Sequence, residues 1–214
     1  MYRIKGKKTI IKICGITTAN ETEYLNKVKI DLVGMVLFFE KSKRNITIDN
    51  AKEIMKTLDD KIKTVAVVVS PTIDQIEEIE NAGFDYIQIH GEMPVGIFDK
   101  TDISVLKAFN VNDMEMYDEY SKISGIKGFV FDAAEPGSGR TFDCNSIRDT
   151  KRSEKWFILA GGLTPDNVAE AIKTVKPDGV DVSSGVEKGD GMGKDYEKIR
   201  RFVRNARGQE GGML

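Results

Sequence analysis

The chain has 214 residues, of which 40% are hydrophobic, and its length is enough for one domain with a sizeable core. It carries 32 basic and 34 acidic side chains, a formal net charge of −2. This near balance argues against a nucleic-acid-binding protein and against a long acidic tail.

The start of the chain and its cysteines bear on location and cofactors. The first residues are basic and then apolar, but Lys12 interrupts the apolar run and no small-residue cleavage pattern follows, so they do not predict a signal peptide. No window of about eighteen uninterrupted apolar residues suggests a membrane span. Cys14, Cys144 and the single histidine, His90, show no metal-ligand spacing. We therefore expect a soluble, cytoplasmic protein without a metal.

Short β-rich runs alternate with helical patterns from the start of the chain. Strands are predicted over Thr9–Ile13, Leu32–Phe38, Ile62–Val69 and Phe84–Ile89. Helices are predicted over Asn20–Val28 and Asp49–Leu58, and around Ile73, Ile76 and Ile79 up to Gly83, with a weak helical stretch at Met93–Phe98. The run Ile62–Val69 is so apolar that we expect it to be buried on both faces, as in a parallel sheet.

The same alternation continues to the end of the chain. Further strands are predicted over Val105–Phe109, Gly128–Phe131, Trp156–Leu159 and Gly179–Val182, and further helices over Asn112–Tyr120, from Thr164-Pro165 onward, and over Asp195–Ala206. Eight such strands with helices between them predict an α/β fold, a single (β/α)8 TIM barrel spanning 1–214. A doubly wound open sheet is the alternative, but it usually has fewer strands. We expect Met1–Lys8 and Gly208–Leu214 to be flexible ends.

The last two predicted strands both run into glycine at their C-terminal ends. Glycine lets backbone N–H groups approach an anion closely, and (β/α)8 barrels often hold a phosphate at the loops after strands seven and eight. Glycines that only form tight turns are the alternative. Because two neighbouring strands share the pattern, we predict a phosphate site formed by Gly161, Gly162, Ser183, Ser184 and Gly185.

Other chemically capable side chains lie at or just beyond predicted strand ends, where the active sites of such barrels are found. They are Cys14, Arg44, His90, Asp132 and Asp181. Taken alone, Cys14 is more simply a small buried residue, Asp132 a turn cap, Arg44 a solvated cation and His90 a hydrogen-bonded structural residue. Beside a phosphate pocket, nearby cations would favour a Cys14 thiolate, and the apolar strand before Asp132 would favour its protonated form.

Five stretches of the chain, in order, resemble the phosphoribosylanthranilate isomerase family, enzymes of tryptophan biosynthesis with a (β/α)8 fold. They are Lys12–Thr17, Ser42–Arg44, Gln88–Gly91, the segment with Gly137-Ser138-Gly139 and Phe142 after Asp132, and the pair formed by 159–168 and 179–187. Together they span almost the whole chain. Glycine loops occur in many phosphate-binding barrels, whereas the Lys12-Ile13-Cys14-Gly15 strand end is much more selective.

The resemblance implies an Amadori rearrangement of N-(5-phosphoribosyl)anthranilate to 1-(2-carboxyphenylamino)-1-deoxyribulose 5-phosphate, without a cofactor. It implies that Asp132 is the general acid at the ribose ring oxygen and that the Cys14 thiolate removes the C2′ proton. Arg44 would hold the anthranilate carboxylate, and His90 and Asp181 would line the substrate pocket. The expected partner is a small phosphorylated substrate, with the chain as a monomer or homodimer. The path of the glycine-rich stretch Lys188–Lys194 is not specified.

Two other functions remain open at this point. A histidine-pathway Amadori isomerase has a related mechanism but characteristically works with two aspartates, whereas the first predicted strand here ends in Cys14. A non-catalytic barrel that binds a phosphorylated metabolite would keep the glycine loops but would need neither Cys14 nor Asp132.

Overall fold

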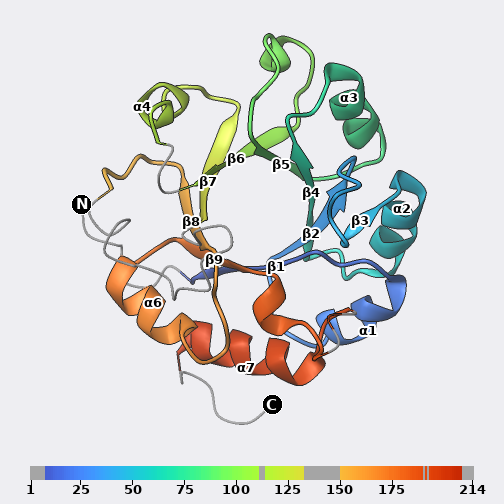
Figure 1. The fold of residues 1–214 in the computed structure, drawn as a ribbon, viewed down its shortest axis with the longest axis vertical. Helices are drawn as coiled ribbons and strands as arrows, with labels where there is room; N and C mark the ends of the chain where they lie inside the picture. The colour runs from blue at the N-terminus through green and yellow to red at the C-terminus, as the bar shows by residue number, and fades with distance from the viewer. Residues whose placement is uncertain (1–7, 111–113, 133–149, 190, 192, 209–214) are drawn as a thin grey trace.

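The computed structural model describes residues 8–110, 114–132, 150–189, 191 and 193–208. Within them, eight parallel strands form a closed barrel, because β1 pairs with β2 on one side and with β9 on the other (Figure 1). The barrel strands are β1 (Ile10–Cys14), β2 (Leu32–Leu37), β4 (Lys63–Val69), β5 (Tyr86–His90), β6 (Ser104–Asn110), β7 (Ile126–Asp132), β8 (Trp156–Ala160) and β9 (Gly179–Val182). The predicted (β/α)8 fold is confirmed.

Helices surround the barrel on its outside (Figure 1). They are α1 (Thr22–Leu25), α2 (Ile48–Thr57), α3 (Ile73–Asn81), α4 (Tyr117–Tyr120), α6 (Val168–Val175) and α7 (Tyr196–Arg207), with the 3₁₀ turns η1 (Ala19–Glu21), η2 (Ile97–Asp99) and η3 (Ser184–Val186). Capping side chains define where several of them begin. The Asp195 carboxylate, for example, accepts a hydrogen bond from the backbone N–H of Lys198 at the start of α7. Among the described helices, none combines the length and apolar character needed to cross a bilayer.

Three predicted helices are shorter in the structure. Within the stretch Asn20–Val28, the helical residues are the end of η1 and the four residues of α1. The helix ends before Asn26, whose side chain donates to the carbonyl of Thr57 at the end of α2 and accepts from the N–H of Asp59. The weak helical stretch at Met93–Phe98 is the turn η2. Of the predicted helix Asn112–Tyr120, only α4 is helical among the described residues.

One short strand was not predicted. β3 (Asn45–Ile46) pairs with the end of β2, beside the barrel rather than within it. Two residues are too few to show the two-residue alternation from which a strand is inferred. Of the ends expected to be flexible, Lys8 and Gly208 are described, and Lys8 forms an ion pair with Asp31. The other residues of those ends lie outside the described part of the chain.

The apolar core has two layers, one inside the barrel and one between the barrel and the helices. The inner layer consists of Leu32, Val65, Val67, Leu106, Ala108, Val130, Ile158 and Ala160, and Cys14 packs against it. β4 is buried along its length from Thr64 to Val68, so the predicted burial of this strand on both faces is confirmed. Because side chains alternate along a strand, the inward positions above this layer face the C-terminal mouth of the barrel.

Candidate active site

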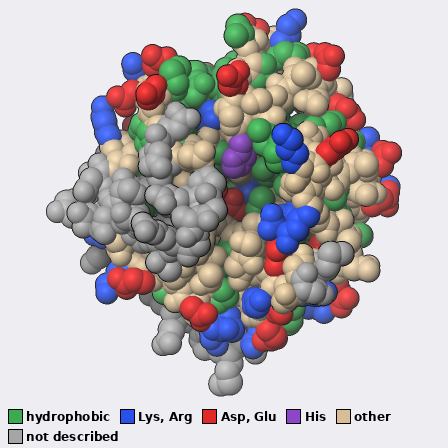
Figure 2. Space-filling view, in the orientation of Figure 1, with side chains coloured by type: hydrophobic (Ala, Val, Ile, Leu, Met, Phe, Trp, Pro, Cys, Tyr) green, Lys and Arg blue, Asp and Glu red, His purple; other side chains and the backbone are tan. Residues whose placement is uncertain are grey.

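A cavity of about 240 Å³ opens at the C-terminal ends of the barrel strands. Figure 2 shows a hollow near the centre of this face, with basic side chains beside it. The cavity is lined by residues of β1, β5, β7, β8 and β9 and of the loops that follow β8 and β9: Cys14, Gln88, His90, Val130, Asp132, Ala160, Gly161, Gly162, Leu163, Asp181, Val182, Ser183 and Ser184. Cys14, His90, Asp132 and Asp181, singled out from sequence, therefore lie around one cavity.

The two glycine-rich loops form one wall of this cavity. Gly161 and Gly162 have φ angles of +85° and +62°, a left-handed backbone that favours glycine. Gly185 does not line the cavity. A Cβ at that position would collide with the carbonyl oxygen of Leu163, so this glycine allows the loop after β9 to pack against the loop after β8. Among the described residues, no backbone carbonyl accepts from the N–H groups of Gly162, Ser184 or Gly185, which leaves them available to an anion.

Cys14, the last residue of β1, is half-buried at the cavity wall. Its sulfur lies beside the ammonium group of Lys12, since both groups would be 2.9 Å from a Cβ on Gly34. Burial raises the pKa of the Cys14 thiol above its ordinary value, and the Asp181 carboxylate adds to this, while Lys12 and Lys194 act in the opposite direction. The two cations thus favour the thiolate, as expected from sequence, but in the ligand-free site the effect of burial on the pKa of Cys14 is larger than theirs.

Lys12 lies inside the barrel and is completely buried. Its Nζ is 2.8 Å from Oδ2 of Asp181 on the neighbouring strand β9, where the two residues are direct partners in the pairing register. Burial alone would lower the pKa of Lys12, but Asp181 and Cys14 raise it above its ordinary value, so the side chain stays charged. The other oxygen of Asp181, Oδ1, is buried and has no hydrogen-bond partner among the described residues.

His90 and Gln88 form a pair on the inner face of β5. The Gln88 Nε2 lies 2.8 Å from His90 Nε2, so the two side chains are within hydrogen-bond distance. Burial, together with the charges of Lys12 and Lys107, lowers the pKa of His90 to about 4, so the ring is neutral at pH 7. The Gln88 Oε1 is buried and, within the described residues, has no hydrogen-bond partner.

Arg44 lies at the edge of the site, in the segment between β2 and β3. Its side chain packs against Gly15, where a Cβ would collide with it and would also lie 3.1 Å from the Ser183 hydroxyl. Its Nε donates to Oε1 of Glu187 at 2.6 Å. The two terminal nitrogens of the guanidinium group form no hydrogen bond to another described residue. The end of the Arg44 side chain is therefore available to a ligand.

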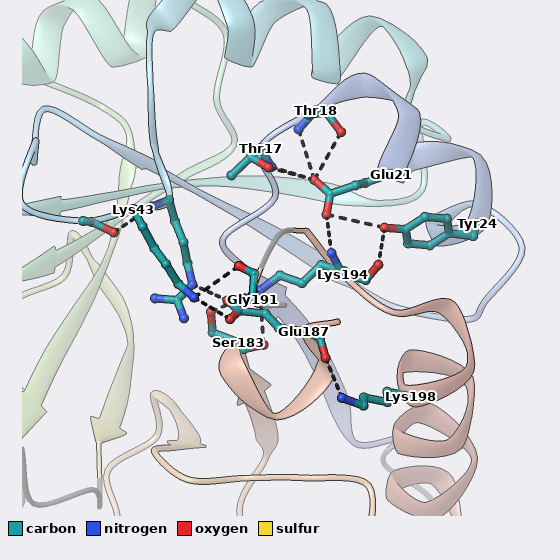
Figure 3. Close-up of polar contacts among 12 residues, drawn as sticks. Thr17, Thr18, Glu21, Tyr24, Lys43, Ser183, Glu187, Gly191, Lys194 and Lys198 are labelled. Carbon is teal, nitrogen blue, oxygen red and sulfur yellow. Dashed lines mark hydrogen bonds and ion pairs between the residues drawn. The ribbon is translucent and has the colours of Figure 1, made fainter. Parts of the chain in front are cut away.

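Glu187 is the centre of a polar cluster beside the cavity (Figure 3). Its carboxylate accepts from Arg44, from Lys43 at 3.0 Å and from Lys194 at 3.4 Å. Burial alone would raise the pKa of Glu187, but the hydrogen bonds from Arg44 and Lys43 and the charge of Lys194 lower it to about 2. One carboxylate thus faces three cations, which leaves a positive surplus at the edge of a cavity suited to an anion.

Lys194 closes the same cluster from the other side (Figure 3). Its backbone N–H donates to Glu21, its carbonyl accepts from Tyr24, and its buried ammonium donates to the carbonyl oxygen and hydroxyl of Ser183. An antiparallel bridge between Glu187 and Lys194 brings the two ends of the glycine-rich stretch together. This establishes the course of that stretch at its two ends.

Several residues in and beside the cavity were not singled out from sequence. Lys12, Gln88, Glu187 and Lys194 were not assigned a role, although a lysine inside an apolar strand is a signal that could have been used for Lys12. Conversely, the segment with Gly137-Ser138-Gly139 and Phe142, on which part of the resemblance rests, lies outside the described residues, as does Cys144.

The chain is similar to one family of known proteins over almost its whole length. Residues 11–205 match the family described as N-(5′-phosphoribosyl)anthranilate (PRA) isomerase. The N-(5′-phosphoribosyl)anthranilate isomerase of Listeria welshimeri is 38% identical over 206 residues, which cover 94% of this chain and 100% of that protein.

Two solved structures of this family are also similar to this chain in fold. A phosphoribosyl anthranilate isomerase in complex with reduced 1-(o-carboxyphenylamino)-1-deoxyribulose 5-phosphate has a TM-score of 0.77 at 34% identity, covering 92% of this chain and 98% of that chain. A structure of monomers of the dimeric enzyme from Thermotoga maritima has a TM-score of 0.76, with the same identity and coverage. The resemblance inferred from the motifs is thus confirmed, and the chain belongs to the N-(5′-phosphoribosyl)anthranilate isomerase family of tryptophan biosynthesis.

Proposed function

We propose that this chain catalyses the Amadori rearrangement of N-(5-phosphoribosyl)anthranilate to 1-(2-carboxyphenylamino)-1-deoxyribulose 5-phosphate, with Asp132 as general acid and Cys14 as general base. The observation that carries the proposal is that both side chains line one cavity whose wall is made by the two glycine-rich loops. An internal transfer between C1′ and C2′ of one sugar needs one acid and one base and no cofactor.

The reaction would proceed through two proton transfers by these side chains, followed by tautomerisation. Asp132 gives its proton to the ribose ring oxygen as the C1′–O bond breaks, and the nitrogen lone pair forms the C1′–N double bond. The Cys14 thiolate then takes the C2′ proton, and the C–H electrons form a C1′–C2′ double bond while the iminium nitrogen regains its lone pair. The resulting enolamine takes a proton at C1′ and loses the one on the C2′ hydroxyl, which gives the ketone.

The cavity and its edge together offer a partner for each end of the substrate. The loop positions Gly161, Gly162, Ser183 and Ser184, together with the Gly185 N–H, would hold the phosphate. The free end of the Arg44 fork suits the anthranilate carboxylate. The buried acceptors Gln88 Oε1 and Asp181 Oδ1 would accept hydrogen bonds from sugar hydroxyls, which would end their unpartnered state. His90, neutral and adjacent to Gln88, would line the pocket.

Turnover of freshly formed phosphoribosylanthranilate tests this proposal directly, because the fluorescence of the anthranilate adduct falls on rearrangement. We expect the purified chain to produce this decrease and to leave the larger imidazole-bearing substrate of the histidine pathway unchanged. Tight binding of the product without any turnover would instead support a non-catalytic phosphate-binding barrel. Turnover of the imidazole substrate alone would support the other Amadori isomerase.

We predict that Arg44→Ala raises KM by about 10–100-fold and changes kcat much less, because a charged, bidentate hydrogen bond to the carboxylate is lost in the ground state and the transition state alike. Steady-state kinetics in the fluorescence assay measure this. Arg200→Ala, which removes an exposed arginine of α7 paired only with Glu197 among the described residues, is the matched control. Unchanged KM and kcat in Arg44→Ala would remove this residue from the site.

For this enzyme we also propose a cytoplasmic location and a monomeric or homodimeric state. The location follows from the class of reaction, a step of amino-acid biosynthesis that uses a phosphorylated metabolite. The oligomeric proposal is supported by the Thermotoga maritima relative, which is described as dimeric and also as monomers.

A further inference from the structure

An ion pair buried inside the barrel lies directly beneath the proposed base. Lys12 and Asp181 are 0% and 7% exposed, and their charged atoms are 2.8 Å apart on the paired strands β1 and β9. A buried ion pair gains little net stability over apolar residues of the same size, because both charges lose their hydration. Its position inside the barrel, below the cavity, therefore calls for a role other than stability.

The ammonium group of Lys12 also lies close to the sulfur of Cys14. The two residues are separated by one position on β1, so both point into the barrel, and both end groups lie beside Gly34. Gly34 on β2, the register partner of Cys14, leaves the space in which they meet. A Cβ on Gly34 would lie 2.9 Å from both Cys14 Sγ and Lys12 Nζ, closer than side chains tolerate.

We propose that Lys12 is a positioning residue for the reaction: its ammonium group, anchored on Asp181, holds the Cys14 sulfur at the cavity wall and stabilises its thiolate form. This inference rests on the proposed role of Cys14 as the base. In this proposal the two oxygens of Asp181 have different roles: Oδ2 binds Lys12, and Oδ1 remains available to a ligand in the cavity.

The other charged or titratable groups near Cys14 each come from a different strand or loop, and they are Asp181, Lys194, Arg44, His90 and Asp132. Lys194 also favours the thiolate, but its ammonium group donates hydrogen bonds to Ser183 and Glu187. His90 is neutral at pH 7. Asp181 disfavours the thiolate, and its effect on the pKa of Cys14 is smaller than that of Lys12. Lys12 is therefore the cation whose removal changes Cys14 most.

The ionisation of Cys14 can be measured without turnover, from the pH dependence of its alkylation by iodoacetamide, because only the thiolate reacts. A Cys144→Ser background leaves Cys14 as the single cysteine of the chain. We expect Lys12→Met to move the midpoint at least about one pH unit upward, which slows alkylation at pH 7 about tenfold or more. The acidic limb of kcat/KM should move in the same direction. Lys173→Met, an exposed lysine of α6, is the matched control and should move neither.

A second variant covers the case in which Lys12→Met does not fold, since it leaves Asp181 as an unpaired buried carboxylate. Lys12→Met/Asp181→Asn removes both charges, and we expect its midpoint to rise as well, by less than in the single variant. A folded variant of either kind with the parental midpoint would overturn the inference. The proposed function fails separately: if Cys14→Ala keeps normal turnover, Cys14 is not the base, whatever the alkylation midpoint shows.

Discussion

Cys14→Ala is expected to lower kcat by about 10²–10⁴-fold, the usual contribution of a positioned general base, and to leave KM within a few-fold. The substrate is gripped at its phosphate and carboxylate ends, so loss of a proton acceptor between them removes a transition-state interaction alone. Loss of one small, half-buried sulfur should not unfold the barrel, which circular dichroism and thermal unfolding can verify. Single-turnover measurements in the fluorescence assay then give the rate of the chemical step.

Two comparisons make this result specific. Cys14→Ser keeps the size of the side chain but offers a hydroxyl that hardly ionises near pH 7, so it should lose nearly as much kcat as Cys14→Ala. Cys144→Ser, at the only other cysteine, should keep parental turnover and should remain sensitive to alkylation. Near-normal turnover in either variant at Cys14 would show that another group removes the C2′ proton.

The raised pKa of Cys14 gives this prediction a pH dependence of known sign. A base works only when it is unprotonated, so kcat/KM of the free enzyme should fall as the pH drops below the pKa of the thiol and rise toward the alkaline side. His90 stays neutral down to a pH of about 4, so it does not contribute to that limb.

The fold could be predicted from sequence because its signals are local. Each barrel strand is a short apolar run, and β4 shows this most clearly, since it is buried on both faces. Helix lengths were less predictable: the contact of Asn26 with the end of α2 is tertiary, and it ends the helical segment before the sequence pattern does. A pattern within one segment contains no information about such a contact.

The same distinction between local and tertiary signals applies to the residues of the site. Cys14 and Asp132 could be singled out because both lie where a predicted strand ends, and the active sites of such barrels are found at the C-terminal ends of the strands. The pairing of Lys12 with Asp181 could not, because it joins residues 169 positions apart and exists only once β1 and β9 close the barrel. Glu187 is similar: its cluster joins the β2–β3 segment to the end of the glycine-rich stretch, whose path the sequence leaves open.

Asp132→Asn is expected to lower kcat by about 10²–10⁴-fold, because asparagine keeps the shape and polarity of the side chain but cannot give a proton to the ring oxygen. Asp132 is the last residue of β7 and lines the cavity, so the change is confined to the cavity wall. Asp118→Asn, at an exposed acid of α4, is the matched control and should keep parental kinetics.

A substrate deuterated at C2′ separates the two proposed roles, because only the second step breaks the bond to that atom. In Cys14→Ser, proton removal becomes the slow step, and the full primary isotope effect on kcat should appear. In Asp132→Asn, ring opening becomes the slow step, so the isotope effect should nearly vanish although kcat is equally low. The reverse pattern would exchange the acid and the base, and a full isotope effect in both variants would mean that Asp132 acts on proton removal rather than on ring opening.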